Sequence, residues 1–301
     1  MLGFTINHRI KLNAEEASLM PPGEVVSVND KNIHVYIEGD GEDTLVFMAG
    51  HGTSSPMYDF KPLWSEFKDD YKIAVVEKSG YGFSDISGDE RDIDTLLEET
   101  RQALDKAGLS APYVLMAHSM SGLEAIRWAQ LYPTEIKAII GLDPAVPEAY
   151  DLIELPSNAQ LGMMRLITGV GFSRLMPKED LEKTLPLLSS DVLSNEEKTQ
   201  YQSLFYKRSL TKDMVNEAKA IRSNVETVSE AALPTSTPMH FFISSEQDEL
   251  LPGWQTALTD FLSNLDNHGH TVLETGHYVH HEKSETIAAE IRTFLDALIQ
   301  D

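Results

Sequence analysis

The sequence predicts an α/β protein with a mostly parallel sheet, and three observations lead to this. Short apolar runs typical of strands alternate with longer amphipathic segments typical of helices. One serine, Ser119, lies in a tight connection between such a strand and the helix that follows it. The alternation is interrupted once, by a purely helical stretch, and then resumes.

The amino-terminal part is expected to be β structure that leads into the alternating pattern. Two apolar runs flank the polar turn Asn29-Asp30-Lys31-Asn32, which predicts a hairpin. In order, we expect strands at residues 24–28, 33–38 and 44–49, a helix at 58–67, a strand at 72–76 and a helix at 92–107.

The second part continues the alternation on both sides of the helical stretch. Before it we expect a strand at 113–116, a helix at 123–131 and a strand at 136–142. After it we expect a strand at 239–244, a helix at 254–265, a strand at 271–273 and a helix at 284–299.

The helical stretch itself, residues 148–232, is amphipathic and contains no convincing strand. Because both of its ends return to the same sheet, we interpret it as a lid over the carboxyl edge of that sheet. The predicted division is a core of residues 1–147 and 233–301 with an inserted lid of residues 148–232.

Composition excludes several classes of function. The 301 residues carry 48 acidic and 24 basic side chains, a formal net charge of -24, so nucleic acid and anionic membranes are poor partners. The absence of cysteine excludes a disulfide framework, a thiol nucleophile and a thiolate zinc site. No apolar run has the length of a signal-peptide core or a membrane span. We expect a cytoplasmic protein that acts on a small molecule; the sequence leaves its oligomeric state open.

The stretch around Ser119 has the form of a nucleophile elbow. The residues two before and two after the serine, Ala117 and Ser121, are small, as a sharp strand-to-helix turn requires. Such a turn exposes the serine Oγ above the sheet and aims the N–H of Met120 at the position where negative charge forms during acyl transfer.

A serine nucleophile needs a base and an acid, and both should follow the carboxyl ends of strands. His277, in the loop after residues 271–273, is the predicted base. Asp248, after residues 239–244, is the predicted acid, and Asp143, at the end of the strand after the elbow helix, is its rival. We favour Asp248 from its placement in the chain. The order Ser119, Asp248, His277 is that of a known hydrolase architecture.

The remaining histidines of the same region are interpreted as ordinary. His280 and His281 fall at the start of the last helical region and read as surface or capping residues. A metal cluster of His280, His281 and Glu282 is disfavoured, since adjacent residues do not share a helix face. We therefore expect no metal and no cofactor.

The second oxyanion donor is predicted in Gly50-His51-Gly52-Thr53, which leaves a strand at the same sheet edge. Two glycines allow a close approach of the backbone, and the Thr53 N–H would pair with the Met120 N–H. Ser84, in Gly80-Tyr81-Gly82-Phe83-Ser84-Asp85, lies in no strand-turn-helix context and is expected to be structural.

Taken in order, these motifs resemble those of a lid-bearing α/β-hydrolase of the serine esterase and peptidase-like branch, over nearly the whole chain from residue 24 to 299. The resemblance implies an eight-stranded sheet flanked by helices, a triad of Ser119, Asp248 and His277, and oxyanion donors at Thr53 and Met120. The proline iminopeptidase branch is disfavoured by Ala-His-Ser-Met-Ser at the elbow. Epoxide hydrolases and haloalkane dehalogenases of this fold, which use an aspartate nucleophile, are disfavoured by Ser119.

The expected function is that of a serine hydrolase cleaving a small carboxylic ester or related acyl compound. Aminopeptidase-like amide cleavage, C–C cleavage and perhydrolysis use similar chemistry and remain open. The alternative from another class is a ligand-sensing or partner-binding protein with little turnover. Side chains of the lid would either line an apolar pocket or pack the lid on the sheet: Met163, Met164, Leu166, Ile167 and Phe172.

Overall fold

The computed structural model describes residues 2–300, and the eight strands expected from the resemblance form one sheet in the order β1-β2-β4-β3-β5-β6-β7-β8. The first two pairings, β1 with β2 and β2 with β4, are antiparallel, and the others are parallel. The strands are β1 (Glu24–Val28), β2 (Lys31–Glu38), β3 (Thr44–Met48), β4 (Lys72–Glu77), β5 (Tyr113–His118), β6 (Ile136–Leu142), β7 (Met239–Ser244) and β8 (His268–Leu273).

The predicted hairpin is confirmed, and its turn explains the register. Asn29 and Asp30 have positive φ angles of 48° and 60°, the conformation that a two-residue type I′ connection requires. Asparagine and aspartate tolerate this conformation better than other side chains. The turn pairs Val28 with Lys31, and the register places Ile33 and Val35 in the core.

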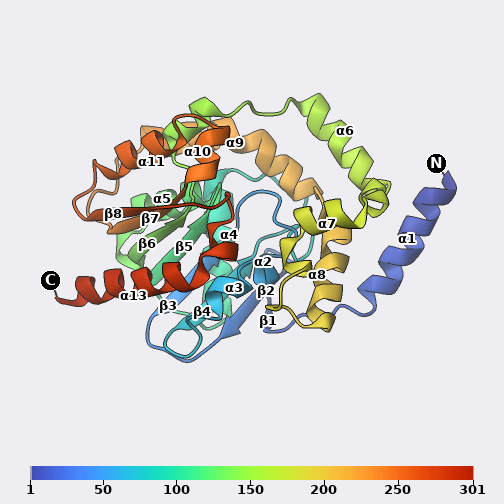
Figure 1. Cartoon of the computed structure of the whole chain (residues 1–301), viewed down its shortest axis with the longest axis horizontal. Coiled ribbons are helices and arrows are strands. Elements are labelled where there is room, and N and C mark those ends of the chain that lie inside the picture. Colours follow the sequence, from blue (N-terminus) through green and yellow to red (C-terminus); the bar gives the residue numbers. More distant parts are fainter. Residues whose placement is uncertain (1, 301) are drawn as a thin grey trace.

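Helices cover both faces of the sheet (Figure 1). One apolar layer joins the sheet to α4 (Ile93–Lys106), α5 (Ser121–Leu131) and α11 (Trp254–Leu262). The opposite layer joins it to α2 (Pro56–Asp59), α3 (Lys61–Trp64) and α13 (Ser284–Gln300). Each large apolar side chain that is fully buried in these layers contributes about 1.5–3 kcal/mol to folding.

Helix α4 shows how local sequence determines an element. The side chain of Asp92 caps its first turn by accepting a hydrogen bond from the Thr95 N–H. Leu97 and Leu104, seven residues apart, both face the core. The expected helix at 92–107 is thus found, with Asp92 as its cap.

Helices also occupy the stretch between β6 and β7, and the described part of it contains no strand. Ser157 and Ser194 form capping boxes with Gln160 and Glu197, three residues further on, at the starts of two of these helices. The helices are α6 (Asn158–Gly169), α7 (Lys178–Thr184), α8 (Asn195–Arg208) and α9 (Lys212–Glu230), with short 3₁₀ turns between them.

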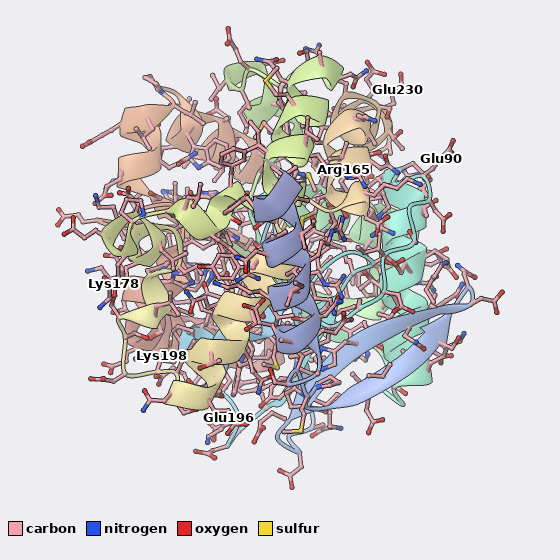
Figure 2. The ribbon with its side chains drawn as sticks, turned by 90° about the vertical axis from the view of Figure 1, so that its right-hand side faces the viewer. Glu90, Arg165, Lys178, Glu196, Lys198 and Glu230 are labelled. Atoms are coloured by element: carbon pink, nitrogen blue, oxygen red, sulfur yellow. The ribbon has the colours of Figure 1, made fainter. Side chains whose placement is uncertain are left out.

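An amino-terminal helix, α1 (Leu2–Glu16), was not expected from the sequence. It lies beside α8 rather than against the sheet (Figures 1 and 2). Glu15 accepts from Arg174 at 2.5 Å and Glu16 accepts from Lys207 at 2.8 Å. This part of the predicted core segment therefore packs on the helical stretch.

Three other local differences concern helices. The helix expected at 58–67 is divided into α2 and α3 at Phe60. Two short helices were not expected, α10 (Ser245–Leu250) after β7 and α12 (Val279–Glu282) after the His277 loop. Both new helices carry residues that were considered for the site.

No helix within residues 2–300 combines the length and the apolar character that crossing a bilayer requires.

Candidate active site

Ser119 lies at the turn between β5 and α5 with a positive φ of 55°. A non-glycine residue adopts this conformation at some cost in energy, and such strain is characteristic of the nucleophile elbow. Ala117 is fully buried, and the Ser121 hydroxyl lies 2.6 Å from the carbonyl of Met48 and 2.8 Å from that of His118. The Ser121 hydroxyl thus ties the elbow to β3.

The loop after β3 passes so close to the elbow that position 50 must be glycine. A Cβ added at Gly50 would lie 2.6 Å from the Ser119 Cβ and 3.2 Å from its Oγ. Such contacts are shorter than carbon atoms tolerate, so the close approach of this loop to the candidate nucleophile requires glycine.

His277 forms its carboxylate contact with Asp143, which was the rival prediction. The His277 Nδ1 lies 2.6 Å from Asp143 Oδ2, a distance typical of a charge-assisted hydrogen bond. The other carboxylate oxygen accepts from the Ser244 N–H at 2.9 Å and from the Trp254 indole N–H at 2.8 Å. Asp143 is fully buried, and these three donors satisfy its carboxylate.

Asp248, the favoured acid, is not at this position. It lies in α10, and its Oδ1 accepts the backbone N–H of Gln255, at the start of α11, at 2.8 Å. The end of β7 instead supplies the Ser244 N–H to Asp143. The carboxylate beside His277 therefore comes from the end of β6, the strand adjacent to β5 in the sheet, and not from the segment after β7 as predicted.

The His277 loop is held directly against the elbow by His118. The His118 Nε2 lies 3.2 Å from the His277 carbonyl oxygen, and the two rings are 4.8 Å apart. Burial, together with the charges of His277 and His280, holds the pKa of His118 well below its ordinary value. His118 is thus neutral, with Nε2 as the donor to that carbonyl.

The loop after β3 lies between the elbow and α9. Gly52 has a positive φ of 85°, and Thr53 is buried. The Thr53 side chain shares a hydrogen bond with Tyr278, which follows His277 in the chain. The ring of His51 contacts the Met214 carbonyl oxygen at 2.8 Å. The predicted oxyanion loop is therefore connected both to the histidine loop and to the helical stretch.

A cavity of about 390 Å³ opens beside His277 and Thr53. Its far wall comes from α7, α8 and the segment between them. The lining includes Lys183, Thr184, Leu185, Pro186, Tyr201 and Phe205. The cavity is within the size range of small-molecule sites.

Neither interpretation of the lid side chains is correct. Met163 and Leu166, on α6, are each 64% exposed, and Met164, Ile167 and Phe172 are exposed as well. These five side chains therefore line neither the cavity nor the interface with the sheet. Helical periodicity identified the helix but not which of its faces is covered.

Ser84 is structural, as expected. It is fully buried, and its Oγ accepts from the His34 N–H at 2.8 Å and donates to the Glu77 carbonyl. Glu77 in turn accepts from the Phe83 N–H at 2.7 Å, which holds the loop against β4.

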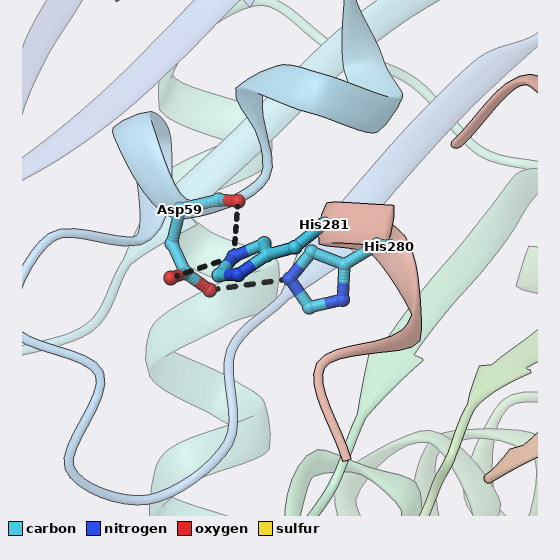
Figure 3. A group of neighbouring side chains, drawn as sticks. All are labelled: Asp59, His280 and His281. Atoms are coloured by element: carbon cyan, nitrogen blue, oxygen red, sulfur yellow. Dashed lines mark hydrogen bonds and ion pairs between the residues drawn. The ribbon is translucent and has the colours of Figure 1, made fainter. Parts of the chain in front are cut away.

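His280 and His281, expected at the surface or as caps, form a buried cluster with Asp59 of α2 (Figure 3). The His280 Nε2 lies 3.2 Å from Asp59 Oδ2, and the His281 Nε2 lies 3.2 Å from Oδ1. Burial, only partly offset by the Asp59 hydrogen bond, lowers the pKa of His280 to about 4. Burial opposes ionisation of Asp59, but the two imidazoles hold its pKa well below the ordinary value.

The sequence analysis missed three side chains around the site: His118, Tyr278 and Asp59. His118 and Tyr278 are direct neighbours of the candidate nucleophile and base, and that adjacency is a usable signal. Asp59 has no such signal, because only the folded chain brings α2 to α12.

Comparison with known proteins identifies the family of the chain. Residues 45–290 match the model of the alpha/beta hydrolase family, so the chain belongs to that family. An uncharacterized Bacillus subtilis (strain 168) protein, YbdG, is 42% identical over 236 residues, which cover 78% of this chain and 72% of that protein.

More distant similarities extend to proteins with named activities. Epoxide hydrolase 4 of Mus musculus is 27% identical over 139 residues, covering 45% of this chain and 38% of that protein. The crystal structure of an enol-lactonase from Burkholderia xenovorans LB400 superposes with a TM-score of 0.67 at 14% identity, covering 91% of this chain and 100% of that one. At this identity the structural likeness shows the fold alone. The chain is thus a hydrolase of the α/β-hydrolase superfamily.

Proposed function

We propose that the chain is a serine hydrolase that cleaves a small carboxylic ester through an acyl-enzyme intermediate, with Ser119, His277 and Asp143 as its triad. The observation that carries the proposal is the 2.6 Å contact between His277 and the buried Asp143, in a loop that His118 holds against the elbow. A serine hydroxyl is a weak nucleophile, and an oriented imidazole is the group that activates it.

In the proposed reaction His277 takes the Ser119 proton as the hydroxyl oxygen attacks the ester carbonyl carbon. Asp143 accepts the Nδ1–H, which fixes Nε2 as the basic nitrogen and stabilises the imidazolium. That imidazolium then protonates the leaving alcohol as the C–O bond breaks. Water, deprotonated by His277, cleaves the acyl-enzyme, and the proton returns to Ser119.

The N–H groups of Met120 and Thr53 are proposed as the donors to the tetrahedral oxyanion. Met120 immediately follows the nucleophile, and Thr53 ends the glycine-rich loop that approaches Ser119 through Gly50. Donors that are held in place before the reaction stabilise the developing charge without further reorganisation.

The nature of the elbow residue and the size of the cavity support an ester substrate of modest size. A serine at the elbow favours an acyl-enzyme over the aspartyl intermediate of epoxide opening. The cavity of about 390 Å³ has apolar side chains such as Leu185 and Phe205 on the wall opposite His277. Amide hydrolysis would use the same groups and is the nearest alternative reaction.

The test is covalent labelling combined with turnover. A fluorophosphonate probe is expected to label folded wild-type protein at Ser119, as identified by mass spectrometry of the labelled peptide. Hydrolysis of p-nitrophenyl acetate, butyrate and octanoate is expected to depend on Ser119 and to decline with acyl length. The Ser119→Ala variant should lose both labelling and turnover, whereas Ser84→Ala should keep the label.

Absence of labelling on a folded protein would contradict the proposal. If ligands then raised the melting temperature without being hydrolysed, the ligand-sensing alternative would be favoured. Faster turnover of aminoacyl amides than of any ester would instead favour the peptidase-like reaction.

A further inference from the structure

Asp59, His280 and His281 bring one carboxylate and two imidazoles together (Figure 3), and two of the three, Asp59 and His281, line the cavity. Asp59 ends α2, and the two histidines are adjacent in the four-residue helix α12. One ligand atom from each of the three side chains lies within 4.8 Å of the other two. Although adjacent residues do not share a face of a regular helix, the Nε2 atoms of both histidines reach the Asp59 carboxylate.

The charge of this cluster is incompletely balanced. Asp59 is 4% exposed, and the only ion pairs it makes among the described residues are with these two imidazoles. An imidazole with the ordinary pKa of about 6.5 is mostly neutral above pH 7, so it stabilises a carboxylate by hydrogen bonding without cancelling the carboxylate's charge. A buried negative charge with neutral nitrogen donors beside it is a favourable environment for a divalent cation.

We propose that Asp59, His280 and His281 form a binding site for a divalent transition-metal ion such as Zn²⁺. Nitrogen and oxygen ligands bind zinc at about 2.0–2.2 Å, so neighbouring donors in a tetrahedral site are about 3.4 Å apart. Each histidine nitrogen lies 3.2 Å from a different oxygen of Asp59, close to that separation, and the three ligand atoms lie within 4.8 Å of one another. Binding therefore requires the three side chains to move closer together around the ion.

The access of an ion to the cluster and the number of protein ligands also fit a zinc site. Asp59 and His281 line the cavity, so an ion can enter and a water molecule can take the fourth position. Three protein ligands with one open position are the arrangement of catalytic zinc sites, whereas structural sites have four protein ligands.

The proton balance is simple. Each neutral imidazole binds the ion through the Nε2 lone pair, so the ring proton resides on Nδ1. His280 Nδ1 is buried and makes no hydrogen bond, so no existing bond at that atom opposes the proton, and the ion replaces the contact of Nε2 with Asp59. An imidazolium at either position would release one proton on binding, and affinity is therefore expected to fall as the pH is lowered. This inference does not depend on the serine hydrolase proposal.

The first experiment is calorimetric titration of Zn²⁺ into full-length protein that has been dialysed against a chelator. One ion per chain is expected to bind, and Co²⁺ is expected to give the intense visible absorption of a tetrahedral site. His281→Gln and Asp59→Asn should each weaken binding by at least about a hundredfold, since loss of even an outer-shell partner costs about 10–100-fold.

The matched control is His270→Gln, which changes an exposed histidine of β8 and is expected to leave binding unchanged. Loss of binding in this variant, or unaltered binding in both cluster variants, would overturn the proposal, as would the absence of stoichiometric binding by the wild type. Because a cluster variant can lose its fold, melting curves accompany each titration. Anomalous diffraction from zinc-loaded wild-type crystals gives an independent answer, with a peak expected between Asp59 and His281 and a peak confined to surface histidines counting against the site.

Discussion

At the scale of single residues, the candidate nucleophile and the candidate acid both lie at strained backbone positions. Ser119 and Asp143 both have positive φ angles, 55° and 48°. Asp143 also lies directly after β6, and its backbone N–H bonds to the Phe242 carbonyl at 2.7 Å. The surrounding hydrogen bonds thus hold both residues in conformations that an isolated chain would populate rarely.

A pair of isosteric substitutions distinguishes between the two candidate acids, Asp143 and Asp248. Asp143→Asn is expected to lower kcat for an ester substrate by about 10³–10⁴-fold, because the amide cannot hold His277 in the required tautomer. Asp248→Asn should change kcat less than about threefold, because its carboxylate only accepts the Gln255 N–H. Steady-state hydrolysis of p-nitrophenyl butyrate measures both. The reverse order of effects would reinstate Asp248 as the acid.

The sequence indicated a candidate nucleophile and a candidate base but did not distinguish between the two candidate acids. Ser119 lies in a short strand-turn-helix pattern that can be recognised from neighbouring residues alone, and His277 follows the last strand. Asp143 and Asp248 both follow strands of the same sheet, so strand position alone cannot separate them. What separates them is tertiary: the indole N–H of Trp254 and the Ser244 N–H converge on Asp143.

At the scale of elements, α9 is fastened to the core by buried carboxylates. Glu217 accepts from the Tyr81 hydroxyl at 2.5 Å and from Arg91 at 3.4 Å. Asp213 accepts the backbone N–H groups of Ser87 at 2.9 Å and Gly88 at 2.5 Å. This helix is therefore a fixed part of the molecule, and movement over the cavity would have to come from other elements.

Removal of one of these carboxylates should destabilise the protein strongly. Glu217→Ala leaves the Tyr81 hydroxyl without its partner and Arg91 with Glu99 alone, and is expected to cost about 3–5 kcal/mol in the free energy of unfolding. Glu226→Ala, at an exposed position of the same helix, should cost less than about 0.5 kcal/mol. Urea unfolding monitored by circular dichroism compares the two. Equal effects would mean that α9 is not anchored in this way.

The type and approximate bounds of a helix or strand were predictable where its repeating apolar pattern was long. The elements against which it packs were not predictable. The amphipathic pattern located α6, but Met163 and Leu166 face solvent rather than the cavity. α1 has a weak apolar pattern and is held largely by charged side chains such as Glu15, whose partner Arg174 is remote in sequence. Such contacts leave no signal in the local sequence of either partner.

At the scale of the whole molecule, the mostly parallel sheet was predictable because strands alternate with helices along the chain. The net charge of -24 is the other global property. Charged side chains such as Glu90, Lys178 and Glu196 lie on the outside (Figure 2), where acidic residues outnumber basic ones and repel each other. This repulsion lowers the stability of the compact state.

Salt is therefore expected to stabilise the folded protein. Raising the ionic strength from about 0.01 M to about 0.15 M shortens the screening length from about 30 Å to about 8 Å. The melting temperature, measured by differential scanning fluorimetry, should rise over this range. NaCl and KCl should act equally, because screening does not depend on the identity of the cation. A melting temperature that fell in both salts would show that favourable ion pairs outweigh the repulsion.

The position of Asp143 has a consequence for how this architecture can diversify. The nucleophile and its proposed acid are only one strand apart, and both are encoded before the chain departs into α6–α9. Only His277 comes from the part of the chain that follows α9. Segments of different length or sequence could thus replace the one between β6 and β7 without changing the distance between Ser119 and Asp143. New substrate specificities could then arise while these two groups stay in place.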